Sequence, residues 1–238
     1  MISFIVPAYN EEQCLAETIE ALHQAGLALG EAYEVLVADD GSTDKTAAIA
    51  MHHGAVLVSV AYRQIAATRN AGARAATGDY LIFVDGDTVV NEEVVRGAVH
   101  AMHNGAVGGG AGLRFDEPTP LFARFLLLAV VHLFRATRMA TGCFLFCTRS
   151  GFTATGGFDE RYYGAEEIVM SRALKRLGPF VILKQRVTTS ARKIRIHSAI
   201  EVMLFMTRMA LRGTKSLKQR KGMEFWYAER RADPRNDV

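Results

Sequence analysis

Short apolar runs alternate with helix-like segments over the first 104 residues, and this alternation limits the folds open to the chain. Strand-forming runs cover residues 2–7, 33–38, 55–60 and 80–84, and the first is expected to end at its proline, Pro7. Strands that alternate with helices predict a mostly parallel sheet with helices on both faces. The sequence therefore indicates the α/β class.

Acidic residues follow three of these runs. Asp85 and Asp87 follow the run 80–84, Asp39 and Asp40 follow 33–38, and Glu11 follows the first run. A single Asp-Gly-Asp is more often a turn with solvated carboxylates. Three turns with acidic residues at one sheet edge favour a ligand-binding site instead, because ligands bind outside the carboxyl ends of strands. Mg²⁺ and Mn²⁺ are held by one or two carboxylates plus substrate phosphates. The pattern predicts a divalent cation beside a phosphorylated substrate.

The pattern changes after residue 104. Glycines at 108–110 should weaken any strand there, while 151–160 reads as a loop rich in glycine and threonine, and 165–177 as a helix. We expect one domain over 1–187, with a nucleotide-binding half at 1–104 and an acceptor-binding half at 105–187. A basic helical extension is expected over 188–238.

Charge separates that extension from the rest of the chain. Residues 186–238 hold 13 Lys and Arg against 5 Asp and Glu, although the whole chain has a formal net charge of +3. Such an excess implies a solvated surface or an anionic partner, either a phosphate-bearing substrate or anionic lipid. Nucleic acid is not expected, because no nucleic-acid-binding module is recognisable.

Localisation follows from what the sequence lacks. We expect no secretory leader. No apolar run in the sequence is long enough to cross a bilayer, and its three cysteines suit a reducing compartment. We expect a cytoplasmic protein. The segment 199–212 could pack in the core, form a homo-oligomer contact or attach peripherally to the inner face of the membrane, and these alternatives stay open.

Seven segments carry a resemblance to a known family. They are Val6-Pro7-Ala8-Tyr9-Asn10-Glu11-Glu12, Asp39-Asp40-Gly41-Ser42-Thr43-Asp44, Ala67-Thr68-Arg69-Asn70-Ala71-Gly72, Ala76-Thr77-Gly78-Asp79-Tyr80, Asp85-Gly86-Asp87, Gly156-Gly157-Phe158-Asp159-Glu160 and Ala165-Glu166-Glu167. In this order and spacing, over about residues 2–185, the chain resembles the family-2 glycosyltransferases, which have the GT-A fold. The resemblance implies an inverting transfer of a sugar from a nucleotide-diphosphate donor, UDP-sugar before GDP-sugar, to an acceptor hydroxyl.

The resemblance also implies roles for single residues. Nucleoside and donor contacts would come from Pro7, Tyr9, Glu11, Asp39, Asp40, Arg69 and Asp85. Asp85 and Asp87 would line the Mn²⁺ or Mg²⁺ site, with Asp87 the more direct ligand. His197 is either a third metal ligand or an ordinary surface histidine.

Inversion by direct displacement needs a base that takes the acceptor's proton. Glu166 and Glu167 stand where the family carries Glu-Asp, so Glu167 is favoured as the base over Glu166. Otherwise both would only stabilise the N-terminus of helix 165–177. This chain has Glu where relatives have Asp, so the side chain of the base is one methylene longer.

Two other functions compete with this interpretation. A nucleotidyltransferase would need a basic, glycine-rich loop after the first strand, but residues 8–12 are acidic and contain no glycine. A non-catalytic protein that binds nucleotide sugars would bind the donor tightly without transferring or hydrolysing it. Binding and turnover measurements separate these alternatives.

Overall fold

The computed structural model describes residues 1–116, 137–192 and 217–218. Its elements are β1 (Ile2–Ala8), α1 (Leu15–Leu29), β2 (Tyr33–Asp39), α2 (Thr46–His52), β3 (Val56–Ser59), α3 (Ile65–Ala75), β4 (Tyr80–Val84), β5 (Thr88–Val89), α4 (Glu92–His103), β6 (Gly108–Phe115), β7 (Phe144–Thr148), α6 (Arg149–Thr155), α7 (Glu166–Leu177) and β8 (Phe180–Thr189).

The strands form one sheet in the order β3-β2-β1-β4-β7-β6-β8-β5. The first four are parallel to one another, β7 is antiparallel to β4 and β6, and β8 is parallel to β6. Parallel neighbours end at the same edge. The residues after β1, β2 and β4 therefore meet at one edge, as the sequence predicted.

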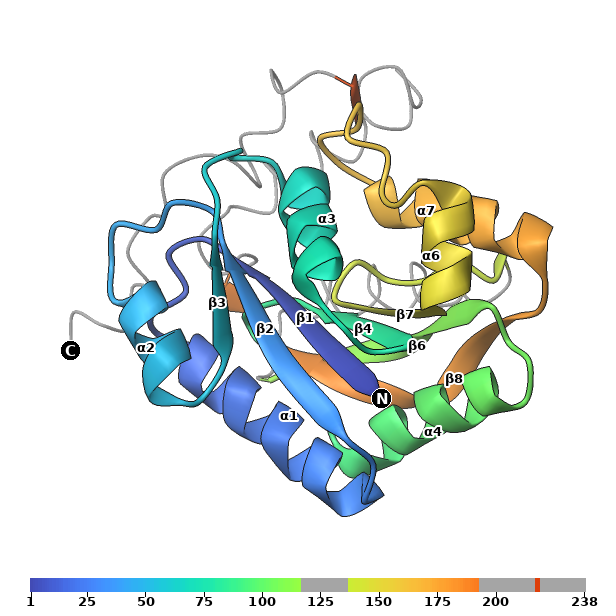
Figure 1. Ribbon diagram of the computed structural model, residues 1–238, viewed down its shortest axis with the longest axis horizontal. Coiled ribbons are helices and arrows are strands. Elements are labelled where there is room, and N and C mark those ends of the chain that lie inside the picture. The colour runs from blue at the N-terminus through green and yellow to red at the C-terminus, as the bar shows by residue number, and fades with distance from the viewer. Residues whose placement is uncertain (117–136, 193–216, 219–238) are drawn as a thin grey trace.

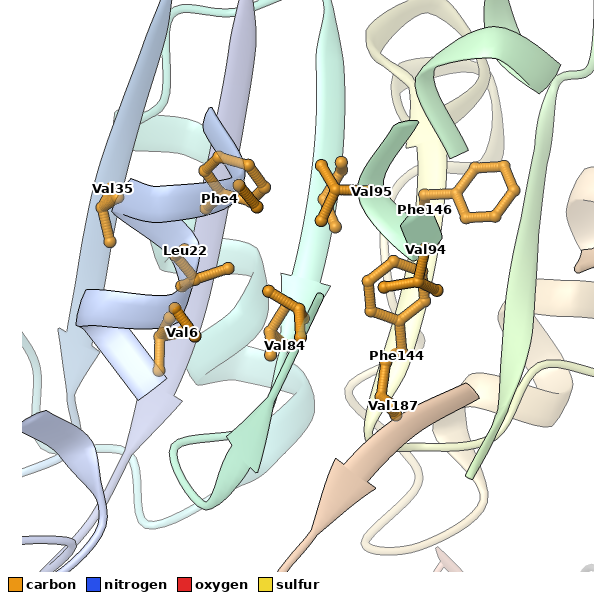
Figure 2. Packing of buried hydrophobic residues seen from close by; sticks show 14 of the residues in the cluster. Phe4, Val6, Leu22, Val35, Val84, Val94, Val95, Phe144, Phe146 and Val187 are labelled. Carbon is orange, nitrogen blue, oxygen red and sulfur yellow. The ribbon is translucent and has the colours of Figure 1, made fainter. Parts of the chain in front are cut away.

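Helices cover both faces of the sheet (Figure 1). On one face, α1 and α4 bury Leu22, Val94 and Val95 against Phe4 and Phe146 (Figure 2). On the other, α3 and α7 pack on the side chains that alternate with these, among them Ile5, Leu81 and Phe83. Both faces are thus apolar, as expected for parallel strands buried on each side. The predicted α/β class and the two helical layers are confirmed.

The expected end of the first strand at Pro7 is wrong by one residue. Strand β1 runs to Ala8, and Pro7 pairs in register with Ala38 of β2. A proline removes one N–H donor from the ladder. At the second-last residue of the strand, the loss of one hydrogen bond does not end the pairing with β2.

The expectation of weak strand structure at 108–110 is also wrong, because these glycines lie inside β6. A Cβ at Gly109 would lie 2.1 Å from the Val181 carbonyl oxygen and 2.3 Å from the Phe146 ring. Close approach of neighbouring strands explains the glycines better than a break in the sheet. The segment 151–160 likewise is not all loop, since α6 continues to Thr155.

Several sequence expectations fall outside the described residues. They concern the segment 199–212, His197 and most of the basic extension 188–238. Within the described ranges, no helix is both long and apolar enough to span a membrane.

Candidate active site

Asp40 lies just beyond β2 and is fully engaged by the protein. Its carboxylate accepts hydrogen bonds from the backbone N–H groups of Tyr62, Arg63 and Gln64, at 2.6, 2.7 and 2.9 Å, and from the Thr68 hydroxyl at 2.8 Å. Gln64 is the residue before α3. Asp40 therefore fixes the N-terminus of α3, where orphan N–H groups need acceptors.

Asp39, one residue earlier, is engaged on one side only. Its Oδ1 accepts from the backbone N–H and the hydroxyl of Ser42. Its Oδ2 has no hydrogen-bond partner in the described part of the chain, although the side chain is 6% exposed. Of the two aspartates, Asp39 is the one with an acceptor oxygen available at the sheet edge.

Two more side chains complete what we call the β1–β2 edge, which consists of Tyr9, Asp39, Asp40 and Arg63. Tyr9 directly follows β1, and the guanidinium carbon of Arg63 lies 3.4 Å from the centre of its ring. The sequence analysis gave Arg63 no role. The contact between Arg63 and Tyr9 is visible only in the fold, because the hydrogen bond from the Arg63 N–H to Asp40 holds the Arg63 loop beside Tyr9.

A second group, the arginine cluster, consists of Arg69, Asp85, Glu166 and Glu167. Arg69 Nη1 donates to Glu166 Oε1 at 2.6 Å, and Nη2 donates to Asp85 Oδ1 at 2.7 Å and to the Gly142 carbonyl at 2.8 Å. The Arg69 side chain is 2% exposed. One buried guanidinium thus joins the first aspartate of Asp-Gly-Asp to the N-terminus of α7.

Glu167 lies beside this bridge but outside it. Its carboxylate packs against Gly142, with Oε1 3.6 Å from where a Cβ would stand on that glycine. Whereas Glu166 is 4% exposed, Glu167 is partly open to solvent. Of the two glutamates, Glu167 is the less buried.

Charge in the cluster is unbalanced, with three carboxylates facing one guanidinium. Burial and the negative charge of Glu166 raise the pKa of Glu167 to about 8, against the pull of Arg69. Burial also raises the pKa of Glu166, and Arg69 opposes that rise. Burial alone would lower the pKa of Arg69, but Asp85 and Glu166 outweigh it, so this pKa is raised and Arg69 stays charged.

Asp87 is held apart from the arginine cluster. It is 6% exposed, and its backbone oxygen accepts from the Ser190 N–H at 3.0 Å. It lines a cavity of about 170 Å³ together with Cys14, Glu17, Thr18, Val89, Asp116, Thr188, Thr189 and Ser190. The two aspartates of Asp-Gly-Asp therefore differ in their surroundings. Asp85 pairs directly with Arg69, whereas Asp87 shares its cavity with hydroxyl and carboxylate side chains and interacts with the charge of Arg192.

Glu11 supports the glycine between those aspartates. Its Cγ lies 3.1 Å from where a Cβ would stand on Gly86, and the Thr18 hydroxyl donates to the Gly86 carbonyl at 3.1 Å. Glu11 Oε2 also accepts from Arg192 Nη2 at 2.6 Å, and both side chains are buried. This ion pair ties the loop after β1 to the segment after β8.

The donor atoms near Asp87 suit a hard divalent cation, which prefers oxygen ligands. Within the described ranges, no three His, Cys, Asp or Glu side chains gather closely enough to hold a metal ion. The described residues thus bring at most two such ligands together. That number fits a cation completed by phosphate and water oxygens.

The structure brings the sequence-predicted residues together in two groups along one edge. Tyr9, Asp39 and Asp40 meet at the β1–β2 edge, and Arg69, Asp85, Glu166 and Glu167 meet in the arginine cluster. Helix α3 connects the groups, since Asp40 caps its start and Arg69 lies within it. Pro7 lies inside β1, and His197 is outside the described residues.

Asn70 also helps to hold the site together, by joining α3 to the segment at Phe158, and this role was not predicted from the sequence. Its amide donates to the Phe158 carbonyl and accepts from the Phe158 N–H, each at 2.9 Å. It also donates to Glu160 Oε1 at 2.9 Å. The adjacent Arg69 and Asn70 stand in a helix made mostly of small residues. This pair is the sequence signal that could have indicated both the bridge made by Arg69 and the contacts of Asn70.

Comparison with known proteins agrees with this geometry. The model of the family described as "Glycosyl transferase family 2" matches residues 3–155. A Pseudomonas aeruginosa protein named undecaprenyl-phosphate 4-deoxy-4-formamido-L-arabinose transferase is 38% identical over 95 residues, which are 37% of this chain and 28% of that protein. This match spans little more than a quarter of that relative.

Solved structures share the fold. A mannosyltransferase of Pyrobaculum calidifontis, in complex with GDP-Man and Mn²⁺, has a TM-score of 0.68 at 18% identity, over 98% of this chain and 66% of that one. S. aureus TarS 1–349 has a TM-score of 0.63 at 17% identity, over 94% and 70% of the two chains. The glucosyl-3-phosphoglycerate synthase of Mycobacterium tuberculosis, with Mn²⁺ and UDP, has a TM-score of 0.60 at 20% identity, over 98% and 81%. These likenesses confirm the GT-A fold, and with the family match over most of the chain they show that it belongs to glycosyl transferase family 2.

Proposed function

We propose that this chain transfers a sugar, with inversion, from a nucleotide-diphosphate donor to an acceptor hydroxyl, and that a divalent cation assists. UDP-sugar is the proposed donor, with GDP-sugar as the main competitor. Neighbours with this fold were solved with each kind of nucleotide, UDP-GlcNAc or UDP in some and GDP-Man in another.

The observation that carries the proposal is the bridge made by Arg69. It joins Asp85, from the donor-side Asp-Gly-Asp, to Glu166, which neighbours the candidate base, through bonds of 2.7 and 2.6 Å. Displacement requires donor and acceptor groups to be held in a fixed mutual geometry. A buried guanidinium bonded to both sides provides that geometry.

Donor binding divides between the two groups of residues. Asp39, with its available oxygen, would accept from a base N–H, whereas Asp40 would act only by holding α3. Asp87 would bind the cation, with Asp85 beside the sugar. When bound, the cation neutralises the charge that grows on the leaving diphosphate.

Glu167 is the proposed general base. It is the less buried of the two glutamates, and once ionised, above its raised pKa of about 8, its carboxylate is a stronger proton acceptor than that of an ordinary glutamate. Glu166 is committed to Arg69 and would serve as a positioning residue.

The acceptor is proposed to be lipid-linked, because the name of one relative contains undecaprenyl phosphate. The reaction would then take place in the cytoplasm, at the inner face of the membrane. If the acceptor were a lipid phosphate instead of a hydroxyl, the attacking oxygen would already be ionised and a base would be unnecessary. Activity of a Glu167 variant separates these acceptors.

Calorimetric titration of UDP and GDP, each with and without Mn²⁺, tests the donor site. Asp87→Ala is compared with Asp79→Ala as a control. Asp79 is an exposed aspartate directly before the first residue of β4, at the end of the strand opposite to Asp85 and Asp87. We expect one nucleotide to bind the wild type and Asp79→Ala with a metal requirement, and Asp87→Ala to lose that requirement. Absence of nucleotide binding in the wild type under every condition would overturn the proposal.

A further inference from the structure

We propose that Arg63, lying on the Tyr9 ring, is the platform on which the donor's nucleobase stacks. The inference rests on the proposed function and adds to it a residue that determines how the nucleoside is held. Its role would be to contact the base, not the diphosphate.

The geometry of the pair is that of two stacked planes. The guanidinium carbon of Arg63 lies 3.4 Å from the centre of the Tyr9 ring. This is a van der Waals separation, which a guanidinium reaches only when it lies flat on the ring. Tyr9 therefore covers one face of the guanidinium. Arg63 as a whole is half-buried, as expected when its other face is open.

The backbone around the pair is fixed before any ligand arrives. Arg63 has φ 52°, in the left-handed region, and its N–H is held by Asp40 at 2.7 Å. Asn10, next to Tyr9, has φ 51°, and it is held by the Ser42 hydroxyl at 2.9 Å and the Thr43 N–H at 2.8 Å. Side chains other than Asn and Asp seldom adopt this conformation, and strain of this kind is concentrated at functional sites.

Arg63 differs from the other arginines near the site in its lack of partners. Arg69 and Arg192 are both buried in ion pairs. The guanidinium of Arg63 makes no hydrogen bond or ion pair within the described residues, although Asp39 and Asp40 are nearby in the fold. A planar cation with an unused face and unused donors is suited to stack on a base and donate to its carbonyl.

The test uses Arg63→Ala and Arg63→Lys, with Arg74→Ala as a control, because Arg74 is an exposed arginine in α3. Calorimetry measures the affinity of each variant for UMP, UDP and pyrophosphate at one fixed Mg²⁺ concentration. Circular dichroism melting checks that each variant is folded. UMP and UDP report on the base, and pyrophosphate reports on the phosphates alone.

We expect Arg63→Ala to weaken UMP and UDP by the same factor, about tenfold, as for the loss of one stacking partner. Arg63→Lys should lose most of that affinity, because it keeps the charge but not the plane. Pyrophosphate binding and Arg74→Ala should match the wild type.

Four results would overturn the inference while leaving the proposed function intact. Tighter UMP binding by Arg63→Ala would mean that Arg63 blocks the Tyr9 face. A loss confined to pyrophosphate and UDP, or full rescue by lysine, would assign Arg63 to the diphosphate. Unchanged affinities would leave it without a role. If the wild type binds no nucleotide at all, the proposed function fails and this inference with it.

Discussion

The β1–β2 edge and the arginine cluster lie along the same edge of the sheet, but their carboxylates are stabilised in different ways. Asp40 is satisfied by three backbone N–H groups and one hydroxyl, and it makes no ion pair with any described residue. In the cluster, Asp85 and Glu166 share one guanidinium, and Glu167 makes no ion pair with the residues that the structure describes. The edge is a rigid support for a planar group, whereas the cluster stores negative charge that a cation or a proton can balance.

Arg69→Met should have the largest effect, because it leaves the buried Glu166 and the partly exposed Asp85 without their cation. We expect a loss of about 3–5 kcal/mol in the free energy of unfolding, measured by urea denaturation, together with loss of sugar transfer. Arg74→Met on the same helix is exposed and should change stability by less than about 0.5 kcal/mol. Equal, small effects of both substitutions would show that the cluster does not depend on its arginine.

Glu167→Gln is expected to separate activity from stability. Loss of the base should slow transfer to a hydroxyl by about 10²–10⁴-fold. The same change removes an unfavourable charge, so the variant should unfold less readily than the wild type at pH 9, by about 1–3 kcal/mol. Turnover assays and urea titrations of both proteins measure these effects.

The pH dependence of that gain follows from the raised pKa of Glu167. The folded protein keeps this proton up to about pH 8, whereas the unfolded chain releases it near the ordinary value of 4.5. The wild type therefore loses stability from this group as the pH rises from 4.5 to 8. The gain of Glu167→Gln should vanish below pH 4.5 and be complete above pH 8. A gain that is constant over this range would assign it to packing, not to charge.

The two adjacent aspartates of the β1–β2 edge should respond differently to the same substitution. Asp40→Asn places an amide against backbone donors and should cost about 1–3 kcal/mol in stability. Asp39→Asn keeps an oxygen for Ser42 and should leave stability nearly unchanged, but weaken nucleotide binding about tenfold. Thermal unfolding and calorimetry on both variants measure this difference, and the reverse pattern would exchange their proposed roles.

The sequence was sufficient to predict the sheet and its edge, because both depend on local patterns. Apolar runs located β1, β2 and β4, and the rule that parallel strands end together placed Asp39, Asp85 and Asp87 on one side. The strand at Gly109 escaped this reasoning. Local propensity disfavours glycine, but Phe146 and Val181 approach so closely that only glycine fits.

The grouping of the site residues could not be predicted in the same way. Arg69 and Glu166 are 97 positions apart, and no local pattern says that α3 faces the start of α7. Likewise, Asp39 and Asp40 are equivalent in sequence, and only the position of the loop before α3 decides which of them is engaged. Long-range packing supplies this information.

Backbone strain gives the finest comparison between the two groups. Asn10, next to the β1–β2 edge, is of a type that tolerates its left-handed conformation. Arg63 of that edge (φ 52°) and Ala165, with φ 57° just before α7, are not. Ala165→Gly should therefore stabilise the protein by about 0.5–1 kcal/mol, and Asn10→Gly should have less effect. Urea titration measures both. If Ala165→Gly destabilises the protein, then the alanine methyl contributes packing that outweighs its strain. If it stabilises the protein but slows transfer, then the strained residue holds Glu167 in place, and rigidity at the arginine cluster comes from the backbone as well as from charge.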